Sequence, residues 1–217
     1  QYDDYTIREA LHNCIAHQDY TMQQRVNFVE NPGYLYYSNA GTFLPGTLEN
    51  ALRNEESQSY FRNECLCKAM VDFNMIDTVS RGIKKMFNEQ WRRHFPMPDY
   101  EIDAVRKKVV VRIYGNEINK RYTDLLKTNN TLSLWDCISL DAVQKGRLIH
   151  ENVAKDLLCR GLIEGEAPNY NISLGVAKNT HQLPSYTKTK GLDKEKLRQM
   201  ILQYLKNTGN ELSLIHI

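Results

Sequence analysis

The sequence predicts an α+β protein in which helices cover one face of a mixed, mostly antiparallel sheet, followed by a smaller helical domain. Three observations carry this prediction. The β-rich runs RVNFVE and YLYYS flank Asn31-Pro32-Gly33, a spacing typical of a hairpin. A third β-rich run, KKVVVRIY, lies further along, and segments with helical periodicity alternate with these runs. After Gly115, helical patterns dominate.

Local patterns define the elements of the first half. A helix is expected over 5–18, because its apolar residues recur three and four positions apart and form one stripe. The hairpin spans 25–38, and the glycines and proline of 38–47 make that segment a loop. The remaining elements expected before Gly115 are helices at 47–54, 61–73 and 77–92 and strands at 99–103 and 107–114.

The second half shows three helical patterns followed by a short hairpin at 162–173. Two of the helices cover 132–143 and 150–161, and Gly161 is placed to end the second of these. Three helices and a hairpin in this order are typical of a winged helix, a DNA-binding variant of the helix-turn-helix. We therefore expect the following division: a first domain at 1–115, a winged-helix domain at 116–175, a linker at 176–192, a helix at 193–211 that begins a truncated second helical module, and an artefactual tail at 212–217.

The third helix of this module carries the candidate DNA contacts. Its polar side and the hairpin tip present His150, Asn152, Lys155, Arg160 and Tyr170, which suit base edges and phosphates. We expect three apolar residues of this helix to face inward: Val153, Leu157 and Leu158. Two acidic residues share the helix and would repel phosphate, so a protein-contact module remains the alternative.

Composition excludes several classes of protein. Of the 217 residues, 41% are hydrophobic and 25% are charged, which excludes a disordered tail and a collagen-like fibre. No run approaches the roughly 18 apolar residues of a membrane span, so we expect no membrane partner. The five cysteines form no CxxC pair, which argues against a zinc knuckle and favours reduced thiols in a cytoplasm.

Charge is distributed unevenly along the chain. Residues 1–103 carry 10 Lys/Arg against 15 Asp/Glu, a net charge of −5, whereas residues 104–217 carry 18 against 11, a net charge of +7. This asymmetry predicts two domains with different partners, and the basic half is a candidate for double-stranded DNA. An ordinary solvated surface would show the same excess, so both interpretations stay open.

Glu9 and Asn13 form the candidate catalytic pair. They stand four residues apart, so both lie on one face of the first helix, away from the apolar stripe. A carboxylate can orient or deprotonate a water, and an amide oxygen can bind Mg²⁺. Exposed helices carry this spacing without any function, so the spacing alone leaves both interpretations open.

Two further groups each have two interpretations. His17 and Asp19 cap the end of the first helix or form a proton relay. Tyr34, Tyr36 and Tyr37 pack in the core of the sheet or stack on bases.

The run IREALHNCIAHQDY (7–20) resembles the first motif of the GHKL ATPase superfamily, which includes gyrase and the histidine kinases. It is most similar to a divergent branch, the RecG-related ATP-binding proteins and transcriptional regulators. Further segments of those proteins are similar to SNAGTFLPGTL, FRNECLCKAM, VSRGIKKM and GLIEGEAPNYNIS, so the resemblance covers residues 5 to about 175. In such proteins a Schlafen/AlbA-type DNA-binding domain precedes this region.

The resemblance implies ATP and Mg²⁺ as ligands. Glu9 would be the general base or water-orienting residue, and Asn13 the Mg²⁺ ligand. The nucleotide-binding residues implied are Asn13, Asn39, Gly41, Arg62, Asn63, Arg81 and Gly82. Four departures from the family pattern stand out: Asn39 replaces the adenine-binding aspartate, Ser80-Arg81-Gly82 replaces Gly-Thr-Gly, Ala40 replaces the proline of the N-P-G loop, and Gln18 replaces the arginine before Asp19. Arg81 either blocks the phosphate turn or supplies a cation to it.

Two functional hypotheses follow. The first is an ATP-binding, DNA-binding transcriptional regulator with weak Mg²⁺-dependent ATPase activity. The alternative is a non-enzymatic DNA-binding or dimerisation protein with a degenerate nucleotide pocket, acting as a homodimer. A helicase motor is disfavoured, because the chain contains no GxxxxGK[ST] phosphate loop.

Overall fold

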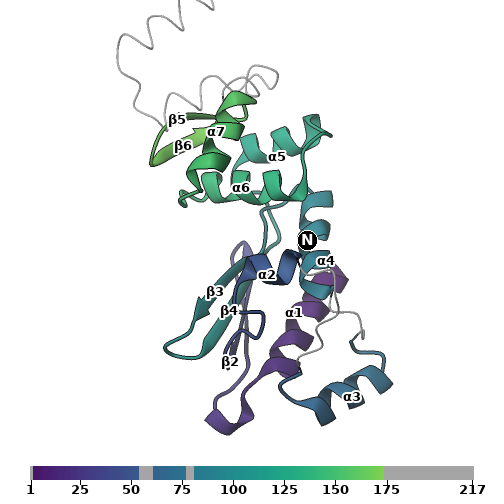
Figure 1. The fold of residues 1–217 in the computed structure, drawn as a ribbon. Helices are drawn as coiled ribbons and strands as arrows, with labels where there is room; N and C mark the ends of the chain where they lie inside the picture. The colour runs from purple at the N-terminus through teal and green to yellow at the C-terminus, as the bar shows by residue number, and fades with distance from the viewer. Residues whose placement is uncertain (1, 54–60, 77–80, 174–217) are drawn as a thin grey trace, which may run out of the picture. The chain divides into compact units, whose positions relative to one another are not determined.

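The computed structural model describes residues 2–53, 61–76 and 81–173 (Figure 1). The described residues all belong to one compact unit, Gln1–Ser173. The expected linker, the helix at 193–211 and the tail at 212–217 lie outside the described residues.

A four-stranded antiparallel sheet in the order β1-β2-β4-β3 forms the centre of the first half. Its strands are β1 (Asn27–Asn31), β2 (Tyr34–Ala40), β3 (Asp99–Asp103) and β4 (Lys108–Tyr114). The first two form the predicted hairpin, and β4 lies between β2 and β3 with antiparallel pairing on both sides. The predicted α+β class and the antiparallel character of the sheet are confirmed.

Helices α1 and α4 cover one face of this sheet (Figure 1). The helices of this half are α1 (Asp4–His17), α2 (Leu48–Arg53), α3 (Glu64–Asp72) and α4 (Gly82–Arg92), with a 3-10 turn at Tyr20–Met22. The α1 helix begins where the Asp3 side chain accepts a hydrogen bond from the backbone N–H of Thr6 at 2.9 Å. This is a standard N-terminal cap, and it fixes the start of the helix that carries the candidate pair.

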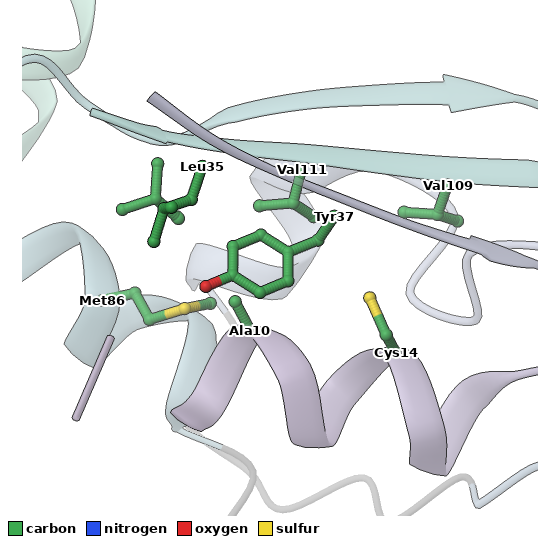
Figure 2. Close-up of a cluster of buried hydrophobic side chains, with 8 residues drawn as sticks. Ala10, Cys14, Leu35, Tyr37, Met86, Val109 and Val111 are labelled. Atoms are coloured by element: carbon green, nitrogen blue, oxygen red, sulfur yellow. The ribbon is translucent and has the colours of Figure 1, made fainter. Parts of the chain in front are cut away.

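The core of this half lies between the helices and the sheet (Figure 2). Small residues on α1, Ala10 and Cys14, let the helix approach β2 closely. Tyr37 points into the core, is fully buried and stacks on Phe28 at a centroid distance of 5.0 Å. The core interpretation of Tyr37 is therefore confirmed, whereas Tyr34 pairs across the sheet with Tyr114.

The second half contains three helices and a two-stranded hairpin in the expected order. They are α5 (Lys120–Thr128), α6 (Leu134–Gln144), α7 (Glu151–Cys159), β5 (Ile163–Glu166) and β6 (Asn169–Ile172). A capping box between Ser133 and Asp136 starts α6. Tyr122, Leu140 and Leu157 are fully buried between these elements.

One prediction for α7 is wrong. Val153 and Leu158 are each 37% exposed, and the buried residues of the helix are Ala154 and Leu157. Ala154 and Leu157 are three residues apart and share the buried side of the helix, whereas Val153 and Leu158 lie at the two edges of that side. The small Ala154, not Val153, completes the inward stripe.

A buried ionic network fastens the second half to the sheet. The Lys145 ammonium lies 2.8 Å from Asp99 of β3 and 2.6 Å from Asp141 of α6, and its side chain is 7% exposed. Arg147 contacts the second oxygen of Asp99 at 2.7 Å, and the Tyr114 hydroxyl donates to the same carboxylate. Lys145 and Arg147 thus neutralise the buried carboxylates of Asp99 and Asp141 where the second half contacts the sheet.

The two carboxylates of this network titrate differently. Burial raises the pKa of Asp99, but hydrogen bonds from Arg147 and Lys145 outweigh it and hold that pKa below its ordinary value. For Asp141, burial is the larger effect and raises the pKa in spite of Lys145. Asp99 is therefore the carboxylate that the two cations stabilise most in its charged form.

Candidate functional site

The Glu9 carboxylate is held from both sides along α1. Its Oε1 accepts a hydrogen bond from the Asn13 side-chain amide at 3.0 Å, and its Oε2 accepts one from the Tyr5 hydroxyl at 3.3 Å. The three residues are spaced four apart, so they form one row on a single face of the helix. The structure therefore brings together the predicted pair and adds Tyr5 to it.

Gly82 closes the site from the opposite helix. It begins α4, and a Cβ built on it would lie only 1.5 Å from Oε1 of Glu9. The Glu9 carboxylate thus lies at the N-terminal end of α4, where the helix dipole favours negative charge. Its backbone is outside the left-handed region, so the glycine is needed here for space and not for conformation.

Asn13 has the chemistry of a cation ligand. Its amide N–H donates to Glu9, and its amide oxygen is a neutral oxygen of the kind that Mg²⁺ accepts as a ligand. Among the described residues, no group of three or more His, Cys, Asp and Glu side chains could hold a metal on its own. Mg²⁺ is usually bound by one or two protein groups together with phosphates and waters, and this pair fits such a shared site.

A pocket of about 210 Å³ adjoins Glu9. Its lining residues are Tyr5, Arg8, Glu9, His12, Asn74 and Met75. This volume is below the roughly 300–1,000 Å³ of typical small-molecule sites, so in this conformation the pocket suits a phosphate group better than a whole nucleotide. Beside it, the Lys85 ammonium lies 3.6 Å from the centroid of the Tyr5 ring.

Sequence reasoning missed Tyr5, Arg8, His12 and Lys85. The spacing contained a signal for three of them. Tyr5 is four residues before Glu9, and Arg8 is four residues before His12. Each pair therefore forms a row along the helix, and both rows lie on the face away from the apolar stripe. Lys85 could not have been assigned, because its approach to Tyr5 depends on how α4 packs against α1.

A second group of predicted residues meets at the other end of α1. The Asn39 amide donates to the carbonyl of His17 at 3.4 Å, and Arg62 and Asn63 donate to carbonyls of the same helix end. Gly41 packs against Arg62 and has a φ of +124°. From Glu9 to His17 the helix rises by about 12 Å, so the predicted nucleotide-binding residues fall into two separate groups.

His17 and Asp19 do not pair with each other in a relay. Asp19 accepts from the backbone N–H of Thr21 at 3.1 Å and so caps the start of the following 3-10 turn, not the end of α1 as the capping interpretation had it. Burial, with a smaller contribution from Arg62, lowers the pKa of His17 and favours its neutral form.

Arg81 is exposed and precedes Gly82 at the start of α4. Its side chain makes no capping hydrogen bond to the helix. Ser80 lies outside the described residues. Whether Arg81 supplies a cation to a phosphate stays a prediction.

The candidate DNA-binding residues differ in what they already contact. Arg160 binds Asp136 of α6 through two nitrogens, at 2.7 and 3.1 Å, and Asp156 at 2.9 Å. These hydrogen bonds raise its pKa, and they tie α7 to α6. Lys155 forms an exposed pair with Glu151 at 2.6 Å.

The other three candidates are at the ends of elements. The His150 side chain caps α7 by accepting from the backbone N–H of Asn152 at 3.4 Å. Asn152 is exposed, and Tyr170 is half-buried on β6. Of the five, Lys155 and Asn152 are therefore the side chains best placed for an external partner.

None of the helices in the described ranges is both long and apolar enough to cross a membrane. The predicted absence of a membrane partner was based on the same property of the sequence.

Comparison with known proteins connects the first half to one family. Residues 28–112 match the model of the family described as "Putative ATP-dependent DNA helicase recG C-terminal", a range that starts in β1 and ends in β4. A search of curated proteins found no match. Among solved structures, the DIP2311 protein from Corynebacterium diphtheriae aligns with a TM-score of 0.46 and 15% identity, over 80% of this chain and 41% of that chain. The chain thus spans less than half the length of that structure. The family match over the sheet supports a GHKL-like ATPase domain in the first half of the chain.

Proposed function

We propose that this chain is an ATP-binding, DNA-binding regulator of transcription, in which the first half binds Mg²⁺·ATP and the second half contacts duplex DNA. The observation that carries the nucleotide part is the position of Glu9. Its carboxylate is fixed by Tyr5 and Asn13 at the N-terminus of α4, a place where helices bind phosphate. The family match to an ATPase-like domain supports the same ligand.

The side chains around this point have separable roles. Bound Mg²⁺ would neutralise phosphate charge and take the Asn13 amide oxygen as one ligand. Glu9 orients the attacking water and accepts its proton, and Tyr5 fixes the rotamer of Glu9. Arg8 and His12 line the adjoining pocket and face an anionic ligand with positive or donor groups. The pocket of about 210 Å³ holds a phosphate group, and the rest of the nucleotide would extend beyond it.

Single substitutions of Glu9 and of Asn13 should separate nucleotide binding from ATP hydrolysis. Glu9→Gln is expected to keep ATP affinity and to lower turnover by about 10²-fold or more, because the general base is lost while its shape is kept. Asn13→Ala is expected to lose Mg²⁺-dependent affinity, because a metal ligand is removed. Calorimetric titration of ATP with and without Mg²⁺, together with phosphate release, measures both effects.

Glu49→Gln is the matched control, since Glu49 is an exposed residue of α2 that pairs only with Arg53 among the partners described for it. It should leave both ATP affinity and phosphate release unchanged. If Glu9→Gln and Asn13→Ala lose binding equally, the pair has a structural role in α1.

The non-enzymatic alternative is favoured by one specific observation. Asn39, Arg62 and Asn63 donate their hydrogen bonds to the end of α1. If these residues stabilise the fold, the domain can keep its structure as a dimerisation scaffold without binding a nucleotide. A wild-type chain that shows no Mg²⁺-dependent heat with ATP would favour this second function.

For the second half we propose duplex DNA as the partner, with α7 as the reading helix. The exposed Asn152 and Lys155 support this proposal, and the positive excess of 104–217 comes from its flanks, since residues 116–173 themselves carry 7 Lys/Arg against 8 Asp/Glu. Binding is expected to fall with salt with a slope that reflects about three to five phosphate contacts, because cations displace counterions from DNA. Lys155→Ala should weaken binding, whereas Arg160→Ala should also loosen α7, since Arg160 is bound to Asp136.

Fluorescence anisotropy of a labelled duplex between 50 and 200 mM salt, roughly the range over which such contacts show, measures this slope. Lys68→Ala on α3 serves as a control cation from the first half of the chain. If the chain binds no duplex in a salt-sensitive way, α7 is a protein-contact surface.

A further inference from the structure

Two side chains close the C-terminal end of α1. The last carbonyls of an α-helix have no partner within the helix and need donors from elsewhere. The Asn63 side-chain amide donates to the carbonyls of Ala16 at 3.0 Å and of Gln18 at 2.9 Å, and Nε of Arg62 donates to the carbonyl of His17 at 3.1 Å. Three successive carbonyls are therefore bound by two adjacent residues from a distant part of the chain.

The rest of the Arg62 guanidinium is also occupied. Nη2 donates to the carbonyl of Thr42 at 2.9 Å and to its hydroxyl at 2.8 Å, and Nη1 lies 3.6 Å from Asp19. The side chain is only 19% exposed. A cation at this position is also favoured by the negative end of the helix dipole.

Gly41 and α3 complete this arrangement. A Cβ at Gly41 would lie 3.1 Å from Nε of Arg62 and 3.2 Å from the carbonyl of His17, and the φ of +124° independently disfavours any side chain. Beneath the polar contacts, Ala16 packs with Cys67 and Met70 of α3. The helix end is thus held by polar and apolar contacts together.

We propose that Arg62 and Asn63 are positioning residues of the candidate nucleotide site: they hold α1 in place, and with it the Glu9–Asn13 pair, without contacting the nucleotide. The proposal rests on the proposed function for the role of that pair. Both hydrogens of the Asn63 amide are used by α1, and the guanidinium of Arg62 is surrounded by protein acceptors. Because α1 is one continuous 14-residue helix, fixing its end sets the rotation and the height of Glu9 two turns away.

The first experiment needs no nucleotide. The side-chain amide of Asn13 reports on the pair, because it donates to Glu9, and its NMR signals are assigned by their loss in Asn13→Ala. Asn63→Ala and Arg62→Ala are expected to shift or broaden these signals. They should also speed hydrogen exchange in the last turn of α1 by about tenfold, the equivalent of one net hydrogen bond. Asn63→Asp, which keeps the shape and removes the donors, should act like Asn63→Ala.

Arg92→Ala is the matched control, because Arg92 forms an exposed pair with Glu89 on α4. It should change neither the Asn13 amide signals nor the hydrogen exchange in the last turn of α1. If Asn63→Ala speeds exchange at the end of α1 but leaves the Asn13 signals where they are, the contacts are local and the proposal is overturned.

The second experiment distinguishes positioning from contact with the nucleotide. If Asn63 acts through α1, Asn63→Ala should lower ATP and ADP affinity by the same factor. Its effect should largely vanish in the Asn13→Ala background, since coupled residues are not additive. Additive effects, or a loss confined to ATP, would show direct contact and overturn the proposal. A wild-type chain that binds no nucleotide overturns the proposed function instead, and the Asn13 signals still decide whether Arg62 and Asn63 position the pair.

Discussion

Replacing Lys145 by methionine is expected to destabilise the fold by about 3–5 kcal/mol. The substitution keeps most of the apolar stem but removes the ammonium between Asp99 and Asp141, whose side chains are each 5% exposed. Asp99 would then keep Arg147 and the Tyr114 hydroxyl, and Asp141 would keep only neutral donors among its described partners. Leaving a buried charge without its partner costs far more than losing a surface pair, and this is the largest stability effect we expect from one substitution.

Urea denaturation followed by circular dichroism at neutral pH measures this loss. Lys155→Met is the matched control, because that lysine pairs with Glu151 at a site where both side chains are more than 60% exposed. Its effect should stay within about 1 kcal/mol. Adding Asp141→Asn to Lys145→Met should recover part of the stability, since it removes one of the unpaired charges. A loss as small as that of the control would show that water reaches the network.

Gly82→Ala is expected to abolish most of the ATP turnover while leaving the fold intact. The new Cβ would lie 1.5 Å from Oε1 of Glu9, so the carboxylate must leave its place beside Asn13. The obstacle is the end of a flexible side chain, so the rest of the structure need not move. The helical backbone at this position accepts alanine without strain, since its φ lies outside the left-handed region.

The measurement pairs thermal unfolding with phosphate release. Turnover should fall by about 10²-fold or more, as for Glu9→Gln, with an unchanged or raised unfolding temperature. Gly146→Ala provides the opposite control: its Cβ would meet nothing within 4 Å, but its φ is +66°. That variant should lose stability and keep turnover. Full activity in Gly82→Ala would mean that the position of Glu9 at α4 is not needed for catalysis.

The described elements of the fold could be predicted from the sequence because their signals are local. The stripe through Ala10 and Cys14 predicted a helix at 5–18, and α1 spans Asp4–His17. Asn31-Pro32-Gly33 predicted the hairpin between β1 and β2. In each case, periodicity or a turn signal within a few residues was sufficient.

The site was predictable only in part. Glu9 and Asn13 were found because their spacing is a property of one helix. The roles of Arg62 and Asn63 at the end of α1 could not be found this way, because their partners are 45 to 47 residues away in sequence. The same is true of Lys145, whose partner Asp99 is 46 residues away.

The location of Asp99 decides how this chain can be divided for study. A fragment that stops at Gly115 would keep Asp99 in the sheet but lose Lys145 and Arg147, so the carboxylate would retain Tyr114 alone among its described side-chain partners. A fragment that starts after Gly115 would keep Lys145 beside Asp141 and lose its contact with the sheet. Each half thus supplies charges that the other half needs, and an N-terminal piece that keeps the candidate site and both cations of Asp99 must extend at least through Arg147.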